Sequence, residues 1–199
     1  QALQLARRLR PDNADALFML GRIAYAKGDP DAAVQHLQTV IRLQPSLPFP
    51  YALLGRAHAK AGREADAAAA IEQGLALHPH DAELQYLQGH ARLQHGDAAG
   101  AVRSYQAALR LEPGLADARV QLGRALLQAG EHEQARVALT DALGHRPESA
   151  DSAHQLGAAL HDLGALDGAA TAYRMALALD ARHAPTLDRL GALTQALGD

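Results

Sequence analysis

The segment GRIAYAKG, residues 21–28, places two glycines seven positions apart in a mostly apolar stretch. Glycine inside a helix costs about 1 kcal/mol relative to alanine, so both positions need a physical reason. Two interpretations fit this segment taken alone. Either the glycines form a loop that binds phosphate, or another element approaches this backbone closely.

The same phrase recurs along the chain at a constant step of 34 residues, beginning at Gly21, Gly55, Gly89, Gly123, Gly157 and Gly191. A recurring alanine keeps the same step at Ala33, Ala67, Ala101, Ala135 and Ala169. A fixed period of this length indicates a repeat protein in which each unit packs on its neighbours. The phosphate-loop interpretation is therefore rejected.

Each repeating unit contains two helical patterns separated by the second glycine of the phrase. In residues 116–149, for example, Gly130 divides the two patterns. Glycine readily adopts the left-handed backbone that follows a helix end, so we expect the second glycine to end the first helix. We expect the first glycine to lie inside that helix and to face the recurring alanine of the second helix, which lets the two backbones pack closely.

These residues resemble the tetratricopeptide repeat, whose pattern combines a 34-residue period, Leu-Gly, a later Ala, a large residue and a second Ala. In the fifth complete unit the pattern is Leu156-Gly157, Ala169, Tyr173 and Ala176. The resemblance implies an all-α fold, a right-handed superhelical solenoid of antiparallel helix pairs. It predicts a single solenoid over residues 1–199. The expected units are a partial repeat at 1–13 (a second helix), complete repeats at 14–47, 48–81, 82–115, 116–149 and 150–183, and a partial repeat at 184–199 (a first helix).

Composition excludes several functional classes. The chain is 48% hydrophobic with a formal charge of −3, which argues against nucleic-acid partners, and it contains no cysteine for disulfides or thiol catalysis. No apolar run approaches the length of about 20 residues that membrane insertion requires. We expect no enzymatic activity, no cofactor and no metal site, because the 11 histidines show no convergent ligand pattern. The localisation stays open, since cytoplasm and periplasm are both compatible.

The resemblance also implies that the first helices line a concave groove. The candidate partner-binding residues are Phe18, Arg22, Tyr25, Arg56, Tyr86, His90, Arg124, His154 and His161. Tyr105 and Tyr173 belong instead to a core column. Arginine binds carboxylates with a two-pronged fork, and aromatic side chains add contact area at low entropic cost. The expected partner is a protein or peptide with acidic groups and apolar anchors.

Alternatives remain open for this face. Asp15, Glu83 and Asp117 lie seven residues before Arg22, His90 and Arg124, so the arginines could form a solvated face that pairs with its own acids. The clamp of Lys and Asn used by chaperone-binding members is not expected, because Lys27 and Lys60 do not form that set. The groove asparagines of the members attached to O-linked sugar transferases are not expected either, because the corresponding column is Met19, Leu53, Leu87, Gln121, Gln155 and Arg189.

The sequence thus predicts a protein–protein interaction scaffold that binds a peptide or partner helix. The excess of alanine, and of arginine over lysine, suggests a GC-rich bacterial genome, and the phase of the repeats suggests a segment of a larger protein. The alternative is a substrate-docking or oligomerisation segment of a multidomain enzyme of the glycosyltransferase, sulfotransferase or hydroxylase type. Self-association through exposed terminal repeats is a further expectation.

Overall fold

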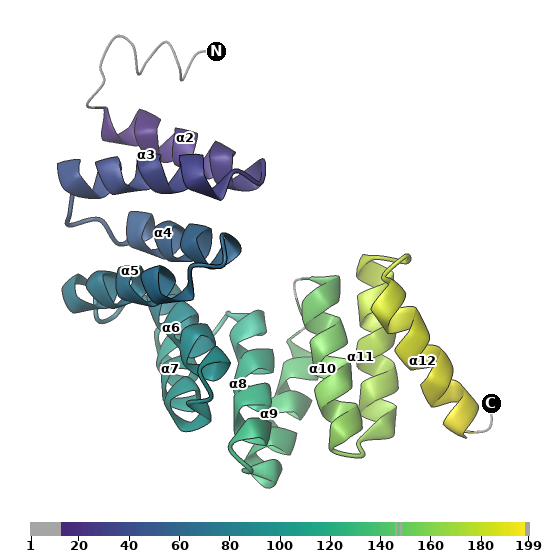
Figure 1. Ribbon diagram of the computed structural model, residues 1–199. Helices are drawn as coiled ribbons and strands as arrows, with labels where there is room; N and C mark the ends of the chain where they lie inside the picture. The colour runs from purple at the N-terminus through teal and green to yellow at the C-terminus, as the bar shows by residue number, and fades with distance from the viewer. Residues whose placement is uncertain (1–12, 146, 148, 198–199) are drawn as a thin grey trace. The chain divides into compact units, whose positions relative to one another are not determined.

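The computed structural model describes residues 13–145, 147 and 149–197, and every regular element in these ranges is an α-helix (Figure 1). The first helices of the repeats are α2 (Ala14–Ala26), α4 (Pro48–Lys60), α6 (Ala82–Gln94), α8 (Ala116–Gln128), α10 (Ala150–Asp162) and α12 (Ala184–Leu197). The second helices are α3 (Pro30–Leu43), α5 (Glu64–Leu77), α7 (Ala98–Leu111), α9 (His132–Gly144) and α11 (Leu166–Leu179). The predicted all-α architecture is confirmed. The second helix expected within residues 1–13 and the glycine expected to end α12, Gly198, lie outside the described residues.

The contacts between Cα atoms divide the chain into two compact units, residues 1–91 and 92–199, each of which is described by itself. In the first unit α2 packs against α3, α3 against α4, and α4 against α5. In the second unit α7 packs against α8, α8 against α9, α10 against α11, and α11 against α12. Neighbouring helices therefore form the core of each unit through contacts that are close in sequence.

A glycine with a left-handed backbone ends each first helix that is followed by a second one. The φ angles are 79° at Gly28, 73° at Gly62, 80° at Gly96, 79° at Gly130 and 71° at Gly164. At the first turn, Gly28 N–H donates to Tyr25 O at 3.1 Å and Asp29 N–H donates to Ala24 O at 2.9 Å, which is the Schellman pattern. The prediction for the second glycine is confirmed at these five turns.

The same turn also begins the next helix. The carboxylate of Asp29 accepts a hydrogen bond from Ala32 N–H at 3.0 Å and so satisfies one of the free amides at the start of α3. Asp97 does the same for Gly100 N–H at 2.8 Å at the start of α7. The same aspartate therefore donates a backbone hydrogen bond that ends a first helix, and its side chain accepts a hydrogen bond from the first turn of the second helix.

At Gly21, Gly55, Gly123 and Gly157, the first glycine of the phrase lies under a large side chain of the following helix. A Cβ atom built at Gly21 would lie 3.1 Å from Leu37 Cγ and 3.6 Å from the carbonyl oxygen of Ala33. The equivalent neighbours are Ile71 for Gly55, Leu139 for Gly123 and Tyr173 for Gly157. At Gly123 the expectation of alanine as the nearest neighbour needs correction, because the three nearest atoms all belong to Leu139. A helical side chain leans towards the N-terminus and covers the preceding turn, so the residue four positions after the alanine covers the glycine.

The core is built from these large side chains and from alanine. Tyr105 and Tyr173 are fully buried, as predicted for the core column, and the recurring Ala33, Ala101, Ala135 and Ala169 are also fully buried. In the second unit Tyr173 packs in one cluster with Leu139, Leu156 and Leu160. Small and large residues therefore alternate across the helix pairs, which is the pattern that fills a helical interface without voids.

Replacing Gly123 and Gly191 by alanine tests this packing with a matched pair. An alanine methyl at Gly123 would overlap the Leu139 side chain, whereas no described neighbour lies within 4 Å of a Cβ at Gly191. We expect Gly123→Ala to destabilise the protein by about 1–3 kcal/mol through overpacking. Gly191→Ala should stabilise it by up to about 1 kcal/mol through helix propensity. Urea unfolding measures both changes, and a stabilising effect of Gly123→Ala would contradict the packing described above.

A buried histidine links the two repeats of the first unit. His58 on α4 is 7% exposed, and its Nδ1 accepts a hydrogen bond from Arg63 Nε at 3.2 Å. Arg63 also forms an ion pair with Asp31 at 2.6 Å. Burial lowers the pKa of His58 and the Arg63 charge lowers it further, against smaller opposing effects of Asp66 and Asp31. Burial and the Arg63 charge therefore keep the His58 ring neutral. Through Arg63 and Asp31, the same contacts join α4 to α3, the second helix of the preceding repeat.

His58→Leu tests the pH dependence that this arrangement implies. Because the folded-state pKa lies below 6.5, the unfolded chain binds more protons just below pH 6.5, and stability falls as the pH falls through that window. Leucine occupies the equivalent position at Leu126 and Leu160, which are 3% and 1% exposed. From pH 8 to pH 5 the melting temperature of the variant should fall less than that of the parent protein, by about 2–4 °C. His80→Leu, at an exposed turn residue, should keep the parental pH dependence.

Candidate functional site

The predicted partner-binding residues all lie on first helices, and the surface that they form within each unit is called the first-helix face below. These residues are Phe18, Arg22, Tyr25, Arg56, Tyr86 and His90 in the first unit and Arg124, His154 and His161 in the second. In the first unit the most apolar part of this face is a pair of rings. Phe18 on α2 and Phe49 on α4 lie edge to face with ring centroids 4.6 Å apart, and Phe49 is 40% exposed. The Arg22 guanidinium lies 5.9 Å from the centroid of the Phe18 ring. A positive charge and exposed aromatic area are thus combined at one place.

Tyr25 is engaged by a lysine from the next repeat. The Lys60 ammonium lies 4.7 Å from the centroid of the Tyr25 ring and donates a hydrogen bond to Tyr25 O at 3.2 Å. This cation–π contact fixes the ring against the end of α4. Tyr25 therefore lies at the rim of the α2–α4 packing and is half-buried.

Arg56 and Glu83 form an ion pair at 2.9 Å between α4 and α6, with side chains that are 41% and 48% exposed. Further along α6, Tyr86 Oη and His90 Nε2 are 3.0 Å apart, and the two rings meet edge to face. These four side chains extend the first-helix face of the first unit beyond the aromatic pair.

In the second unit Arg124 is held by two glutamines. Its Nη1 donates to Gln121 Oε1 at 2.8 Å and to Gln155 Oε1 at 2.9 Å. Gln121 Nε2 also donates to Gln155 Oε1 at 2.6 Å. Gln121 is only 4% exposed, so this polar network joins α8 to α10 from within the interface.

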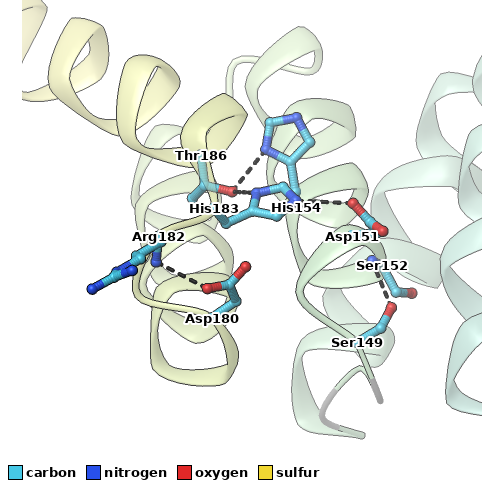
Figure 2. A network of polar contacts seen from close by, with 8 residues as sticks. All are labelled: Ser149, Asp151, Ser152, His154, Asp180, Arg182, His183 and Thr186. Carbon is cyan, nitrogen blue, oxygen red and sulfur yellow. Dashed lines mark hydrogen bonds and ion pairs between the residues drawn. The ribbon is translucent and has the colours of Figure 1, made fainter.

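The two predicted histidines of α10 have different surroundings. His154 Nδ1 lies 3.0 Å from Thr186 Oγ1 at the start of α12 (Figure 2). Its ring also lies near those of Tyr173 and His183. His161 lies 3.8 Å from Asp162, and its side chain is 40% exposed. His154 is thus part of the packing between α10 and α12, whereas His161 faces solvent.

The sequence left open the alternative that the arginines of this face pair with acidic residues of the same face. One such pair forms, but its arginine is not one of those for which the sequence suggested a pairing. Arg56 forms an ion pair with Glu83. Among the described residues, no ion pair joins Arg22 to Asp15 or Arg124 to Asp117. Arg56 and Arg124 instead contact the first helix of the next repeat, whereas Arg22 contacts Phe18 and Met19 of its own helix.

Sequence reasoning missed Phe49, Gln121 and Lys60 as members of this face. Phe49 had a usable signal, because its column otherwise contains Asp15, Glu83, Asp117 and Asp151, and one phenylalanine in an acidic column is unusual. Gln121 and Lys60 gave no such signal, since their roles depend on which side chain of the next repeat they reach.

At the far end of the second unit, the outward face of α12 is open. Leu187 is 49% exposed, whereas Leu17, Tyr51 and Ala153, the described equivalents in α2, α4 and α10, are 4%, 3% and 0% exposed. Gly191, unlike its counterparts, has no described neighbour within 4 Å of a built Cβ. The expectation of self-association through terminal repeats concerns this face and stays a prediction.

The described part of the chain offers neither a metal-binding cluster nor a membrane span. Within these ranges, no three side chains of His, Asp or Glu converge in a way that could hold a metal ion. Of the helices that the structure describes, none has the length and apolar character needed to span a bilayer.

Two tetratricopeptide repeat profiles match the sequence, one over residues 92–159 and the other over residues 1–48 and 53–116. The chain belongs to the tetratricopeptide repeat family. The helix boundaries, the left-handed glycines and the covered glycines described above are the structural counterparts of this family assignment. A search of curated proteins finds no significant match.

Several solved structures of this family share the fold. The MamA protein is 24% identical, with 86% of this chain and 93% of that chain covered and a TM-score of 0.64. TTC0263, a thermophilic TPR protein of Thermus thermophilus, is 21% identical over 92% of this chain and 99% of that chain, with a TM-score of 0.73. YrrB, described as a TPR protein with an unusual peptide-binding site, is 17% identical, with coverage of 95% and 97% and a TM-score of 0.65. These likenesses show the fold.

Gln155→Leu tests whether the glutamine network holds α8 and α10 together. The change removes the shared acceptor and leaves the buried Gln121 amide and one Arg124 N–H without their partner. We expect a loss of about 1–3 kcal/mol in the free energy of unfolding, the usual cost of an unsatisfied buried group. Gln128→Leu, at an exposed position of α8, is the control. Equal urea midpoints for the two variants would show that the network contributes no stability.

Proposed function

We propose that this chain is a non-catalytic scaffold whose first-helix face binds a peptide or a partner helix that carries acidic groups next to large apolar side chains. The observation that carries the proposal is the Phe18–Phe49 pair with the Arg22 guanidinium beside it. Folding alone does not account for this arrangement, because Phe49 exposes 40% of its surface in a column that is otherwise mostly acidic. Aromatic and arginine side chains of this kind provide most of the binding energy in protein interfaces.

The charges of the face support an acidic partner. Within the described residues, Arg22 has an aromatic ring and the Met19 sulfur, at 3.8 Å, as its neighbours rather than a carboxylate. Arg124 is held by amide oxygens and not by an acid. Both guanidiniums therefore keep a net positive charge that a carboxylate can pair with. Arg56 differs, because a partner must first displace Glu83.

The comparisons support the coarser part of the proposal. Tetratricopeptide repeat profiles match most of the chain, and one solved relative, YrrB, is titled as having an unusual peptide-binding site. An interaction scaffold is the function that such a surface serves without any catalytic group. The choice of an acidic and apolar partner rests on the side chains of this chain alone.

Selection from a random peptide library displayed on phage, with the full chain as bait, tests the proposal. We expect the selected peptides to be enriched in Asp or Glu adjacent to Leu, Phe or Tyr. The affinity of a selected synthetic peptide should fall about tenfold with Arg22→Ala, the loss expected when one charged hydrogen bond is removed. Phe49→Ala should cause a similar loss. Fluorescence anisotropy with the labelled peptide measures each affinity.

Arg42→Ala is the matched control, because Arg42 lies exposed on the second helix α3 of the same unit. Its affinity should equal that of the parent protein. Added salt should weaken binding to the parent protein more than binding to Arg22→Ala, since screening acts on the charge pair. Selected peptides without acidic residues, or full affinity in Arg22→Ala, would refute the proposed chemistry.

A further inference from the structure

Four side chains at the junction of α10 and α12 form a continuous polar chain (Figure 2). Asp151 and His154 come from α10, His183 from the turn before α12, and Thr186 from the first turn of α12. His183 Nε2 lies 2.9 Å from Asp151 Oδ1, and His183 Nδ1 lies 2.6 Å from Thr186 Oγ1. His154 Nδ1 lies 3.0 Å from the same hydroxyl. The Thr186 side chain is fully buried, so its hydrogen bonds are made within this chain of groups.

The protons of this chain can be placed with both imidazoles neutral. The Asp151 carboxylate only accepts, so His183 donates from Nε2 and presents a lone pair at Nδ1. The Thr186 hydroxyl then donates to His183 Nδ1. Its oxygen accepts a hydrogen bond from His154 Nδ1–H. Every contact in the chain is satisfied in this state.

One added proton is also accommodated, but a second is not. With His183 charged, both of its nitrogens donate, and the hydroxyl turns to donate to a neutral His154. With both rings charged, the Nδ1–H groups of His154 and His183 both point at the Thr186 hydroxyl. Neither ring then has a lone pair that can accept the hydroxyl proton. The two cations would then lie with ring centroids 5.4 Å apart, with one carboxylate on the far side of His183.

We propose that the Asp151–His183–Thr186–His154 chain is a proton-sensitive latch that holds α12 against α10 and loosens it when both histidines carry a charge. This device concerns the attachment of the last described helix and does not depend on which partner the first-helix face binds. The latch has a functional consequence because the open face of α12 belongs to the same helix whose attachment it controls.

The other groups around the latch favour a neutral His154. From α12 Arg189 adds positive charge near His154, and from α11 the buried Tyr173 packs against its ring. On α10 the negative charge of Asp162 disfavours ionisation of the Tyr173 hydroxyl. From α8 Arg124 donates a hydrogen bond to Gln155, the residue after His154. The charge of Asp151 favours the protonated ring, but this carboxylate is already paired with His183.

The direction of the pKa shift agrees with this geometry. Burial lowers the pKa of His154, and the charges of His183 and Arg189 lower it further. The detached state therefore takes up more protons than the docked state just below pH 6.5. The contribution of His154 to the docking of α12 is therefore fully present above pH 6.5. It decreases as the pH falls towards the lower pKa that His154 has in the docked state.

Amide hydrogen exchange of the full chain tests the latch. The protection factors of α12 amides, which correct for the pH dependence of chemical exchange, are compared at pH 7.5 and pH 5 with those of α8. We expect the protection of α12 to fall relative to that of α8 at the lower pH, because the lowered pKa of His154 makes the docked state bind fewer protons than the detached state. In His154→Gln, whose amide does not titrate, the ratio should not change between the two pH values.

His161→Gln is the matched control, because His161 is on the same helix but exposed to solvent. It should behave as the parent protein. An NMR titration of the histidine Cε1 protons in the unaltered protein gives a second, independent measurement, and His154 should titrate below its ordinary value of 6.5. Titration of His154 at or above that value, or a parental pH response of α12 in His154→Gln, would overturn the proposal.

Discussion

The close contact that a glycine of α2, α4, α8 and α10 makes with a large side chain of the following helix is the constraint on which the rest of this structure depends. A Cβ at Gly21, Gly55, Gly123 or Gly157 would meet Leu37, Ile71, Leu139 or Tyr173 at the distance of a tight or overlapping contact. Because each pair packs so closely, the turn between its helices must be short, and the left-handed glycine makes that turn possible. The second glycine is therefore a consequence of the geometry that the first one permits.

Periodicity made most of the fold predictable from the sequence. Helix boundaries in the described repeats keep the 34-residue step that Gly21 and Ala33 revealed, since each unit repeats the same local instructions. What the sequence did not specify was the neighbour of Gly123. The expectation named the recurring alanine, whereas Leu139 covers the glycine because its side chain leans back over the preceding turn. A column in the sequence identifies a position on the helix but not the direction in which a long side chain extends.

The candidate site was predictable to a smaller degree for the same reason. The columns correctly separated the buried Tyr105 and Tyr173 from the more exposed Phe18 and Arg22. They did not show that Arg124 reaches Gln155, 31 residues later, or that Arg56 reaches Glu83 on α6. These contacts cross from one repeat to the next, and two residues in different columns must extend towards each other to form them. The periodicity of single columns therefore does not predict contacts between residues of different columns.

Polar contacts between repeats therefore differ in kind from the apolar contacts within them. The apolar contacts are repeated, and their strength is nearly independent of pH and salt. The polar contacts are unique to each junction: Arg63 with Asp31, Gln121 with Gln155, and His154 with Thr186. Where such a junction contains a neutral histidine, the stability of the junction depends on pH, whereas the stability of the repeated core does not. The individuality of this chain, both in what it binds and in how it responds to its surroundings, is thus concentrated at the junctions, because the repeated positions are common to every unit.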